Sequence, residues 1–425
     1  MANFVKSKLA RESVEATGDV IDGLSNVEPA EENIDVQLAE VASIDGQLEQ
    51  LDGDQETLAA DTERTEAAID AADEKIENGE EMPEEAIAHT EVAQESIRKR
   101  WAIDRTKLAR ESYRRGRGMT KAAQEGWKET LKDLFERFVE LCKAVIAKAK
   151  ELKLKYINVG KSAQKRAKAY QEMLRKLGKQ KKENISGGFI SKLSIEGEFD
   201  VANSIAIAKE LTGGKAKDAI NKLSSQAADS AVAITKTSDG TATAAKGAVD
   251  VALFGTAAKK LRALPQFEDG EGGQKVLALP GNAYVQTGSK TLAGGQEFTA
   301  VAFLSTGDVS ETKEIATPAI SALASAASAL DVIGKGFEKV LQDFRSYDAD
   351  VEKLEEAAAK AAAALKKSND EGEWEALRNA RTAADQAVRN YQTLNRAVAH
   401  VGNTVISGLN GYIGAGIGAY EKSKA

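Results

Sequence analysis

The sequence has few of the residues that carry enzyme chemistry or cross-links. Its single cysteine, Cys142, excludes an internal disulfide framework, and its two histidines, His89 and His400, cannot by themselves complete a zinc site. Only 5% of the 425 residues are aromatic and five are proline, which disfavours sandwiches and barrels. The sequence contains neither the apolar core of a signal peptide nor a run of about 18 apolar residues. We therefore expect a soluble protein that is not secreted by a cleaved signal and that holds no cofactor.

The residues that are abundant favour helices. Apolar residues, many of them alanine and leucine, make up 42% of the chain, and charged residues make up 29%. This composition is typical of long helices and coiled coils. The sequence predicts a mainly α-helical fold, an elongated helical bundle with a C-terminal antiparallel coiled-coil hairpin and a small β insertion.

Charge is distributed in blocks that the formal net charge of −8 conceals. Residues 1–96 hold 5 Lys and Arg against 27 Asp and Glu, whereas residues 97–196 hold 28 against 11. Residues 197–425 are nearly balanced, with 25 against 28. Opposite blocks attract each other within a chain or between copies, and such association depends strongly on salt.

The N-terminal half is predicted to contain an acidic helical arm followed by basic helices. Small or apolar residues recur every seven residues from Val41 to Ile76, which predicts a helical acidic arm that Gly53 and residues 78–83 interrupt. Apolar spacings of three and four predict an amphipathic helix over 119–155. A second, basic helix is expected over 162–177.

A glycine-rich polar segment at 178–188 is the best domain boundary in the sequence. We divide the chain into an acidic helical arm ending in a basic stretch, a basic amphipathic segment with its linker, and an alanine-rich helical body: 1–118, 119–188 and 189–425. The body begins with helices expected over 201–211, 215–234 and 241–261. Short alternating runs bounded by glycine then predict a β-hairpin or three-stranded insertion within 265–308.

The strongest periodic signal lies near the C-terminus, at 327–406. Apolar residues alternate spacings of three and four on both sides of a polar turn, which predicts two helices folded back as an antiparallel hairpin. The expected pairing seam includes Leu330, Ile333, Phe337, Val340, Phe344, Leu377, Tyr391, Leu394 and Val398. We expect the glycine-rich stretch 405–420 to be a flexible apolar tail that docks on a neighbouring copy; a membrane-active tail is the alternative.

The sequence offers no catalytic arrangement, because neither histidine lies in a setting that resembles a rigid cleft and Cys142 lies beside an apolar stripe. Binding is therefore the remaining class of function. Cations of the basic block can contact phosphates without recognising a base sequence. The candidates are Arg114, Arg115, Arg117, Lys165, Arg166 and Lys168. The same basic surface could instead pair with residues 1–96, and the two uses are equally supported.

The layout resembles a known family. An acidic helical leader, a lysine-rich amphipathic segment at 126–135 and a separate alanine-rich helical region are similar to the internal head or inner-body proteins of large tailed bacteriophages. The resemblance implies a location in the capsid interior after synthesis in the host cytoplasm. It also implies an N-terminal propeptide, removed by a prohead protease after a glutamate that follows a small residue by two positions. Two well-placed triplets match this pattern: Ser194-Ile195-Glu196 and Ala93-Gln94-Glu95.

The leading hypothesis is a non-enzymatic virion structural protein that assembles by helix pairing and undergoes proteolytic processing. Its partners would be other virion proteins or copies of itself, together with packaged DNA bound without sequence specificity. One alternative is a membrane-active helical protein that inserts the apolar segment 275–304 into lipid. Another is a cellular coiled-coil scaffold.

Overall fold

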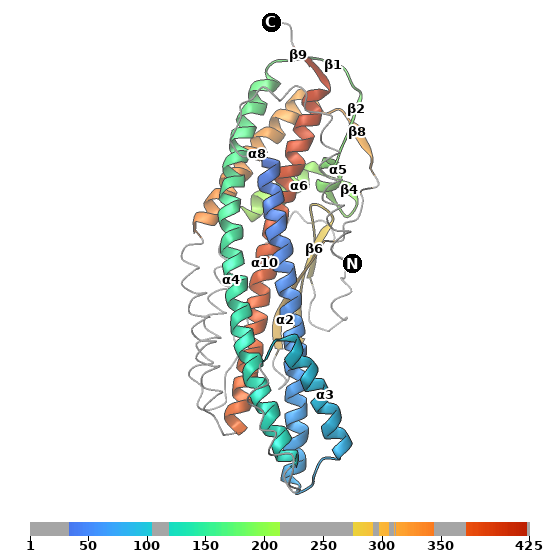
Figure 1. Cartoon of the computed structure of the whole chain (residues 1–425). Coiled ribbons are helices and arrows are strands. Elements are labelled where there is room, and N and C mark those ends of the chain that lie inside the picture. Colours follow the sequence, from blue (N-terminus) through green and yellow to red (C-terminus); the bar gives the residue numbers. More distant parts are fainter. Residues whose placement is uncertain are drawn as a thin grey trace.

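The computed structural model describes seven parts of the chain: residues 34–103, 119–212, 275–291, 297–305, 310, 312–343 and 371–422. These parts are mainly helical, and long helices run side by side along an elongated molecule (Figure 1). The predicted mainly α-helical bundle is therefore confirmed. The helices expected over 215–234 and 241–261 fall outside the described residues.

The acidic arm forms one long helix, α2 (Ile34–Glu77), followed by a shorter one, α3 (Glu84–Arg100). The predicted seven-residue pattern is the buried face of α2, as shown by Val41, Leu48 and Ile69. Gly53 does not interrupt the helix, contrary to expectation, because an isolated glycine costs a helix only about 1 kcal/mol. Residues 78–83 do separate the two helices, with Gly79 at a φ of 67°.

The basic segment forms a single helix, α4 (Met119–Leu174), where two helices were expected. Gly160 lies inside it and meets Gly334 of α8 (Ile320–Asp343). A Cβ atom added to either glycine would lie 2.7 Å from the backbone oxygen of the other. Glycine at this position therefore allows the backbones of α4 and α8 to come into contact. This packing stabilises α4 as a continuous helix despite the low helix propensity of glycine.

The C-terminal helix, α10 (Glu371–Gly418), contains the stretch that was expected to be a flexible tail. That expectation is wrong. Gly408 lies against Leu193 and Gly416 lies against Leu323, so the glycines are points of close packing within the same chain. Gly402 similarly faces the ring of Phe337. α8 and α10 thus run antiparallel where both are described, while residues 344–370 between them fall outside the described residues.

The predicted β insertion is a three-stranded antiparallel sheet in the order β5-β6-β7. Its strands are β5 (Lys275–Leu279), β6 (Ala283–Thr291) and β7 (Glu297–Ser305). β7 packs against α10, so this sheet covers one side of the bundle (Figure 1).

Three short strand pairs were not expected. The first pair lies at the end of the bundle where α4 and α10 finish, and the other two lie nearer to the short helix α5 (Phe189–Lys192) and to α6 (Val201–Leu211) (Figure 1). All are antiparallel: β1 (Leu177–Gln180) with β9 (Tyr420–Lys422), β2 (Asn184–Ser186) with β8 (Glu314–Ala316), and β3 (Ser194–Ile195) with β4 (Glu198–Phe199). The segment 178–188 is thus tied to the C-terminal part of the chain. The three-region division of the chain stays a prediction.

One apolar core runs through the described helices from α2 to α10. Within those parts, one helix, α8 over Ile320–Glu338, is long and apolar enough to cross a membrane by length and composition alone. Its residues Leu323, Leu330, Ile333 and Phe337 are buried in the core, which is typical of the central helix of a bundle.

Candidate nucleic-acid interface and its charged surroundings

The acidic helix α2 lies antiparallel against the N-terminal and middle parts of the basic helix α4, which are its lower and middle parts in Figure 1. Lys128 Nζ is 3.8 Å from Asp73 Oδ1, and Lys155 Nζ is 2.6 Å from Glu40 Oε2. The Gln124 amide also donates to Asp73. Part of the basic block is therefore neutralised within the chain, although each such surface pair adds only about 0–1 kcal/mol to stability.

Helix α10 contributes a cation to the other side of α2. Arg396, whose side chain is 11% exposed, reaches Asp45 at 3.3 Å, Glu49 at 3.8 Å and Asp52 at 4.0 Å. Its guanidinium carbon also lies 5.8 Å from the ring centroid of Phe303 on β7. Burial raises the pKa of Asp45, and the charge of Arg396 opposes that rise. This arginine connects α2, α10 and the sheet.

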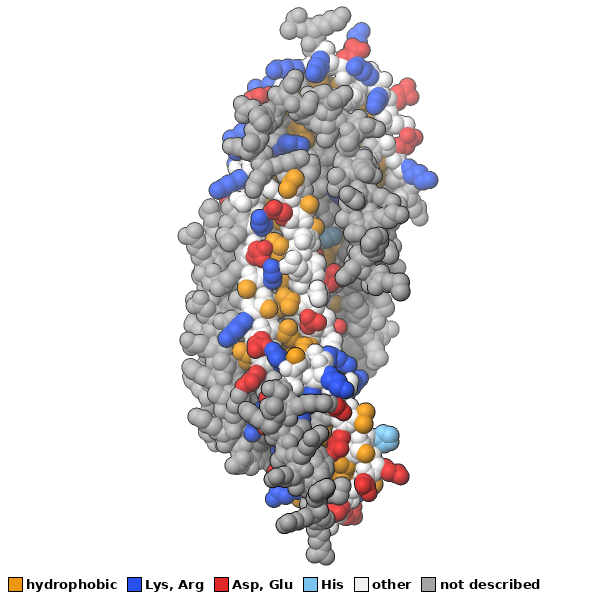
Figure 2. All heavy atoms as spheres, viewed as in Figure 1, with side chains coloured by type: hydrophobic (Ala, Val, Ile, Leu, Met, Phe, Trp, Pro, Cys, Tyr) orange, Lys and Arg blue, Asp and Glu red, His pale blue; other side chains and the backbone are white. Residues whose placement is uncertain are grey.

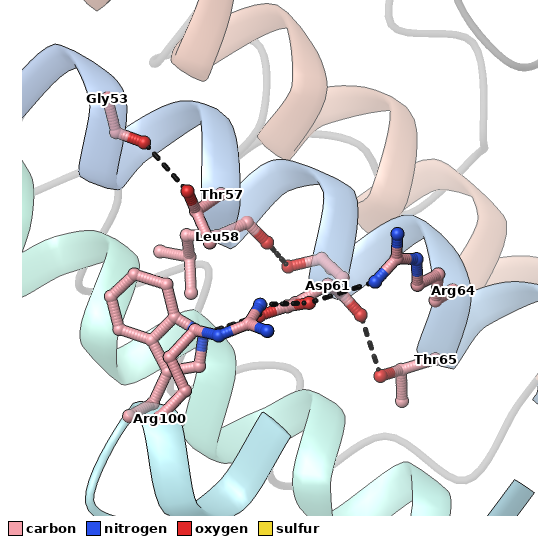
Figure 3. A network of polar contacts seen from close by, with 9 residues as sticks. Gly53, Thr57, Leu58, Asp61, Arg64, Thr65 and Arg100 are labelled. Carbon is pink, nitrogen blue, oxygen red and sulfur yellow. Dashed lines mark hydrogen bonds and ion pairs between the residues drawn. The ribbon is translucent and has the colours of Figure 1, made fainter. Parts of the chain in front are cut away.

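A buried carboxylate, Asp61, holds α3 to α2 (Figure 3). Both of its oxygens accept from Arg100 Nη1, at 2.9 and 2.7 Å, and Trp101 Nε1 donates to Oδ2 at 2.9 Å. On the same helix, Arg64 Nη1 lies 3.7 Å from Asp61 Oδ1, and Thr65 Oγ1 donates to the Asp61 carbonyl. These charge-assisted bonds compensate the cost of burying the carboxylate.

A second buried network fixes α3 on α4. Gln94 Nε2 donates to Thr130 Oγ1 at 2.6 Å and to the Gly126 carbonyl at 3.0 Å. Arg98 Nε donates to the same hydroxyl at 2.9 Å, and Arg98 is 6% exposed. α3 is thus held by specific polar contacts on both of its neighbours.

The upper part of α4 carries the predicted phosphate contacts that the structure describes. Lys165 and Lys168 are exposed. Arg166 is half-buried, and its Nε donates to Asn410 Oδ1 of α10 at 3.2 Å; Tyr170 Oη donates to the same oxygen at 2.5 Å. Of the three candidates on α4, the two lysines therefore face solvent while the arginine also anchors α10. The other predicted contacts, Arg114, Arg115 and Arg117, lie outside the described residues.

The candidate processing residue Glu196 lies in the two-residue turn of the β3–β4 hairpin. Glu196 and Gly197 have φ values of 52° and 83°, as a type I′ turn requires. Gly197 N donates to Asn282 Oδ1 at 2.8 Å. Glu196 and Ile195 are half-buried and Ser194 is buried, so only part of the triplet is accessible at the surface of this ordered hairpin.

The other candidate processing site lies within a helix. Ala93 and Glu95 are on the exposed face of α3, and Glu95 Oε1 is 3.6 Å from Lys99 Nζ. Residues beside them, Gln94 and Ile97, are buried. Exposing this peptide bond to a protease therefore requires α3 to unwind.

The predicted pairing seam is partly buried within one chain. Leu330, Ile333 and Phe337 are buried on α8, and Val398 is half-buried on α10. The remaining seam positions are Val340 in α8 and Leu377, Tyr391 and Leu394 in α10, while Phe344 falls outside the described residues. The coiled-coil character of the hairpin stays a prediction.

His400 is half-buried where α10 meets the turn between β5 and β6. Its Nε2 donates to the Pro280 carbonyl at 3.2 Å, and its ring centroid is 5.2 Å from that of Phe303. Burial lowers the pKa of His400 to about 4; the Pro280 carbonyl opposes this fall and the Arg396 charge adds to it. The histidine is therefore a neutral packing residue at pH 7.

Cys142 is buried on α4, as its position beside the apolar stripe predicts. His89 is exposed on α3. Among the residues that the structure describes, no group of three or more His, Cys, Asp or Glu side chains is arranged to hold a metal ion.

Sequence reasoning did not single out Asp61, Arg396 or Asn410. Asp61 is one of 27 acidic residues in the first 96, and nothing local marks it as buried. Arg396 lies after the predicted seam positions Tyr391 and Leu394, and a cation outside the seam of a helix is expected to face solvent. Asn410 offered one signal, because a polar residue inside an apolar glycine-rich stretch often has a buried partner.

A family model for phiKZ-like phage internal head proteins matches residues 12–415. No curated protein and no solved structure matches the chain.

Proposed function

We propose that this chain, which belongs to the phiKZ-like phage internal head proteins, is a non-enzymatic structural protein that contacts the backbone of packaged DNA with the upper part of α4. Membership of the family places the chain inside the phage capsid, among other virion components. The contact with DNA and the absence of catalysis are our own inferences.

One observation carries the proposal. The cations of α4 differ in their surroundings along the helix: Lys128 and Lys155 lie against carboxylates of α2, whereas Lys168 is exposed beyond them. Exposed lysines at one helical spacing can follow phosphates without contacting bases. This difference supports a division of the two uses that the sequence left open, with pairing to α2 in one part of α4 and contact with phosphates in the other.

The test is binding of a fluorescent duplex at increasing salt. We expect Lys165→Glu/Lys168→Glu to weaken binding roughly tenfold at low salt and to lower the slope of log affinity against log salt by about two. The matched control is Lys121→Glu/Lys143→Glu, which reverses two exposed lysines in the lower half of the same helix. Equal losses in both variants, or no binding by the wild type, would refute the proposal.

We further propose that assembly with other copies uses surfaces other than the predicted seam. Leu330, Ile333 and Phe337 are buried against neighbours in their own chain. The membrane alternative has no comparable support, since β7 packs on α10 instead of leaving the bundle.

For processing, we propose Glu196 as the junction that is accessible in the folded protein. Opening its two-residue turn breaks the bonds from Gly197 N to Asn282 Oδ1 at 2.8 Å and from Ser310 Oγ to the Gly197 carbonyl at 2.9 Å, and it leaves the long helices intact. Opening α3 around Glu95 would instead disrupt the buried network of Gln94 and Arg98.

A further inference from the structure

We propose that the protein binds DNA end-on: a rigid cluster of cations at one end of the molecule is placed on the phosphates, and the long axis points away from the duplex. This inference rests on the proposed contact with DNA and adds its orientation. It concerns a basic cap made of the exposed residues Arg175, Lys176, Lys179, Lys181 and Lys182.

The basic cap is dense in positive charge. Its five cations fall within eight consecutive residues, 175–182, with no acidic residue between them. Exposed Glu183 and Glu421 lie next to it in the sequence and in the paired strand, and Lys422 adds a further cation. The cap therefore keeps a net positive charge, and it continues the exposed lysines of upper α4.

The backbone of the basic cap is held in place. β1 pairs with β9, and the amides of Lys181 and Lys182 donate to the Ala419 carbonyl at 2.8 and 3.2 Å. Tyr420 Oη donates to the Pro318 carbonyl at 2.9 Å, which ties β9 to the segment before α8. Because the loop is already ordered, binding phosphate costs less conformational entropy than ordering a free basic tail.

Among the residues that the structure describes, the opposite end of the molecule carries a cluster of acidic side chains. Six exposed glutamates lie within residues 74–85, where Lys75 is the only cation and is 2.5 Å from Glu80. They are Glu74, Glu77, Glu80, Glu81, Glu84 and Glu85. Figure 2 shows Lys and Arg side chains, with some Asp and Glu among them, at the end of the molecule where α4 finishes, and Asp and Glu side chains at the end formed by α3.

The distance between the two ends makes the orientation selective. α4 alone has 56 residues and spans about 84 Å, many times the Debye length of about 8 Å at physiological salt. The acidic end therefore meets the field of the DNA only when the molecule lies along the duplex. Lying flat is opposed by repulsion at that end, and end-on binding avoids it.

Site-specific cross-linking tests the orientation in the full chain. Single cysteines carrying a photo-reactive group are placed at three exposed neutral positions, Gln180→Cys in the cap, Ala147→Cys midway along α4 and Asn78→Cys at the acidic end. The native Cys142 is buried and does not compete for the label. We expect DNA cross-links at position 180 and background yield at 147 and 78.

Stoichiometry gives a second readout. An end-on molecule should saturate duplex DNA at about 10 base pairs per protein, whereas a molecule lying flat would cover about 25. The variant Lys179→Glu/Lys181→Glu/Lys182→Glu should lower the salt slope by about three. Even cross-linking at all three positions with 25 base pairs covered would refute end-on binding but leave DNA contact intact. Absence of any binding would refute both proposals.

Discussion

At the scale of single residues, buried polar side chains fix how the long helices meet. Asp61 binds α3 through Arg100, Arg396 joins α2 to α10, and Asn410 accepts from two side chains of α4. Apolar faces rich in alanine fit one another in several registers, whereas these bonds form in only one. We attribute the specific alignment of the helices to such contacts.

His400 makes stability depend on pH. Its pKa is about 4 in the folded protein against 6.5 ordinarily, so the unfolded chain binds the proton more readily and stability falls as pH drops from 6.5 to 4. The loss attributable to His400 should be about 3 kcal/mol at pH 4. Chemical denaturation at pH 7, 5.5 and 4.5 should show a shallower decline for His400→Gln than for the wild type.

The control for that measurement is His89→Gln, which removes an exposed histidine on α3. Asp45 has a raised pKa and so acts in the opposite direction, stabilising the fold as pH falls, but it is present in every variant and cancels in the comparison. Parallel pH profiles for the wild type and His400→Gln would contradict the assignment.

At the scale of elements, glycines determine where helices come closest. The crossing of α4 and α8 has Gly160 and Gly334 face to face, and α10 presents Gly402, Gly408 and Gly416 to large side chains of its neighbours. Each glycine gives up helix propensity in exchange for a close approach. The alanine-rich body therefore packs tightly although it has few large side chains.

Substitution at the α4–α8 crossing should be destabilising. In Gly160→Ala the new Cβ would lie 2.7 Å from the Gly334 carbonyl oxygen, and the backbone there cannot move as a side chain does. We expect a loss of about 1–3 kcal/mol in the free energy of unfolding. The matched control, Gly46→Ala, is inside α2 with nothing within 4 Å and should gain about 0.5–1 kcal/mol. Urea titration distinguishes the two, and equal effects would show that the crossing is looser than described.

The same elements show which parts of the fold can be predicted from the sequence. Periodicity located the buried face of α2 and the helix α6, and alternation located the three strands of the insertion, because these depend on local pattern. The tail at 405–420 was misread because glycine is a breaker in isolation, and here neighbouring side chains fill the space that it leaves. The pairs β1–β9 and β2–β8 join residues far apart in sequence, so no local pattern predicts them.

The candidate interface was foreseen in composition but not in geometry. Counting charges identified the basic block and its acidic counterpart. Which cations face carboxylates and which face solvent depends on where α2 lies along α4, as Lys155 and Lys168 illustrate. That alignment is tertiary, and one sequence does not supply it.

At the scale of the whole molecule, the two halves of the chain interlock. α4 packs along α8, α2 packs against α10, and Gln392 Nε2 donates to the Leu48 carbonyl at 2.6 Å. The chain on one side of Glu196 thus shares its core with the chain on the other side. A cut in the β3–β4 turn would sever the chain without separating the helices.

Limited digestion with a glutamate-specific protease tests this. We expect cleavage after Glu196 to precede cleavage after Glu95, and fragments 1–196 and 197–425 to elute together under native conditions and separately in denaturant. Mass spectrometry identifies the cuts, and Glu196→Gln should abolish this pair of fragments. Earlier cleavage after Glu95, or separation of the two fragments in native buffer, would contradict the expectation.

The basic cap and the six glutamates lie at opposite ends, and this placement gives the described part of the chain an electric dipole moment along its length. Two such rods side by side have lower electrostatic energy when they point in opposite directions than when they point the same way. Crowded copies in a closed shell would therefore alternate in direction without a dedicated contact. Raising the ionic strength would abolish that ordering and leave each fold intact.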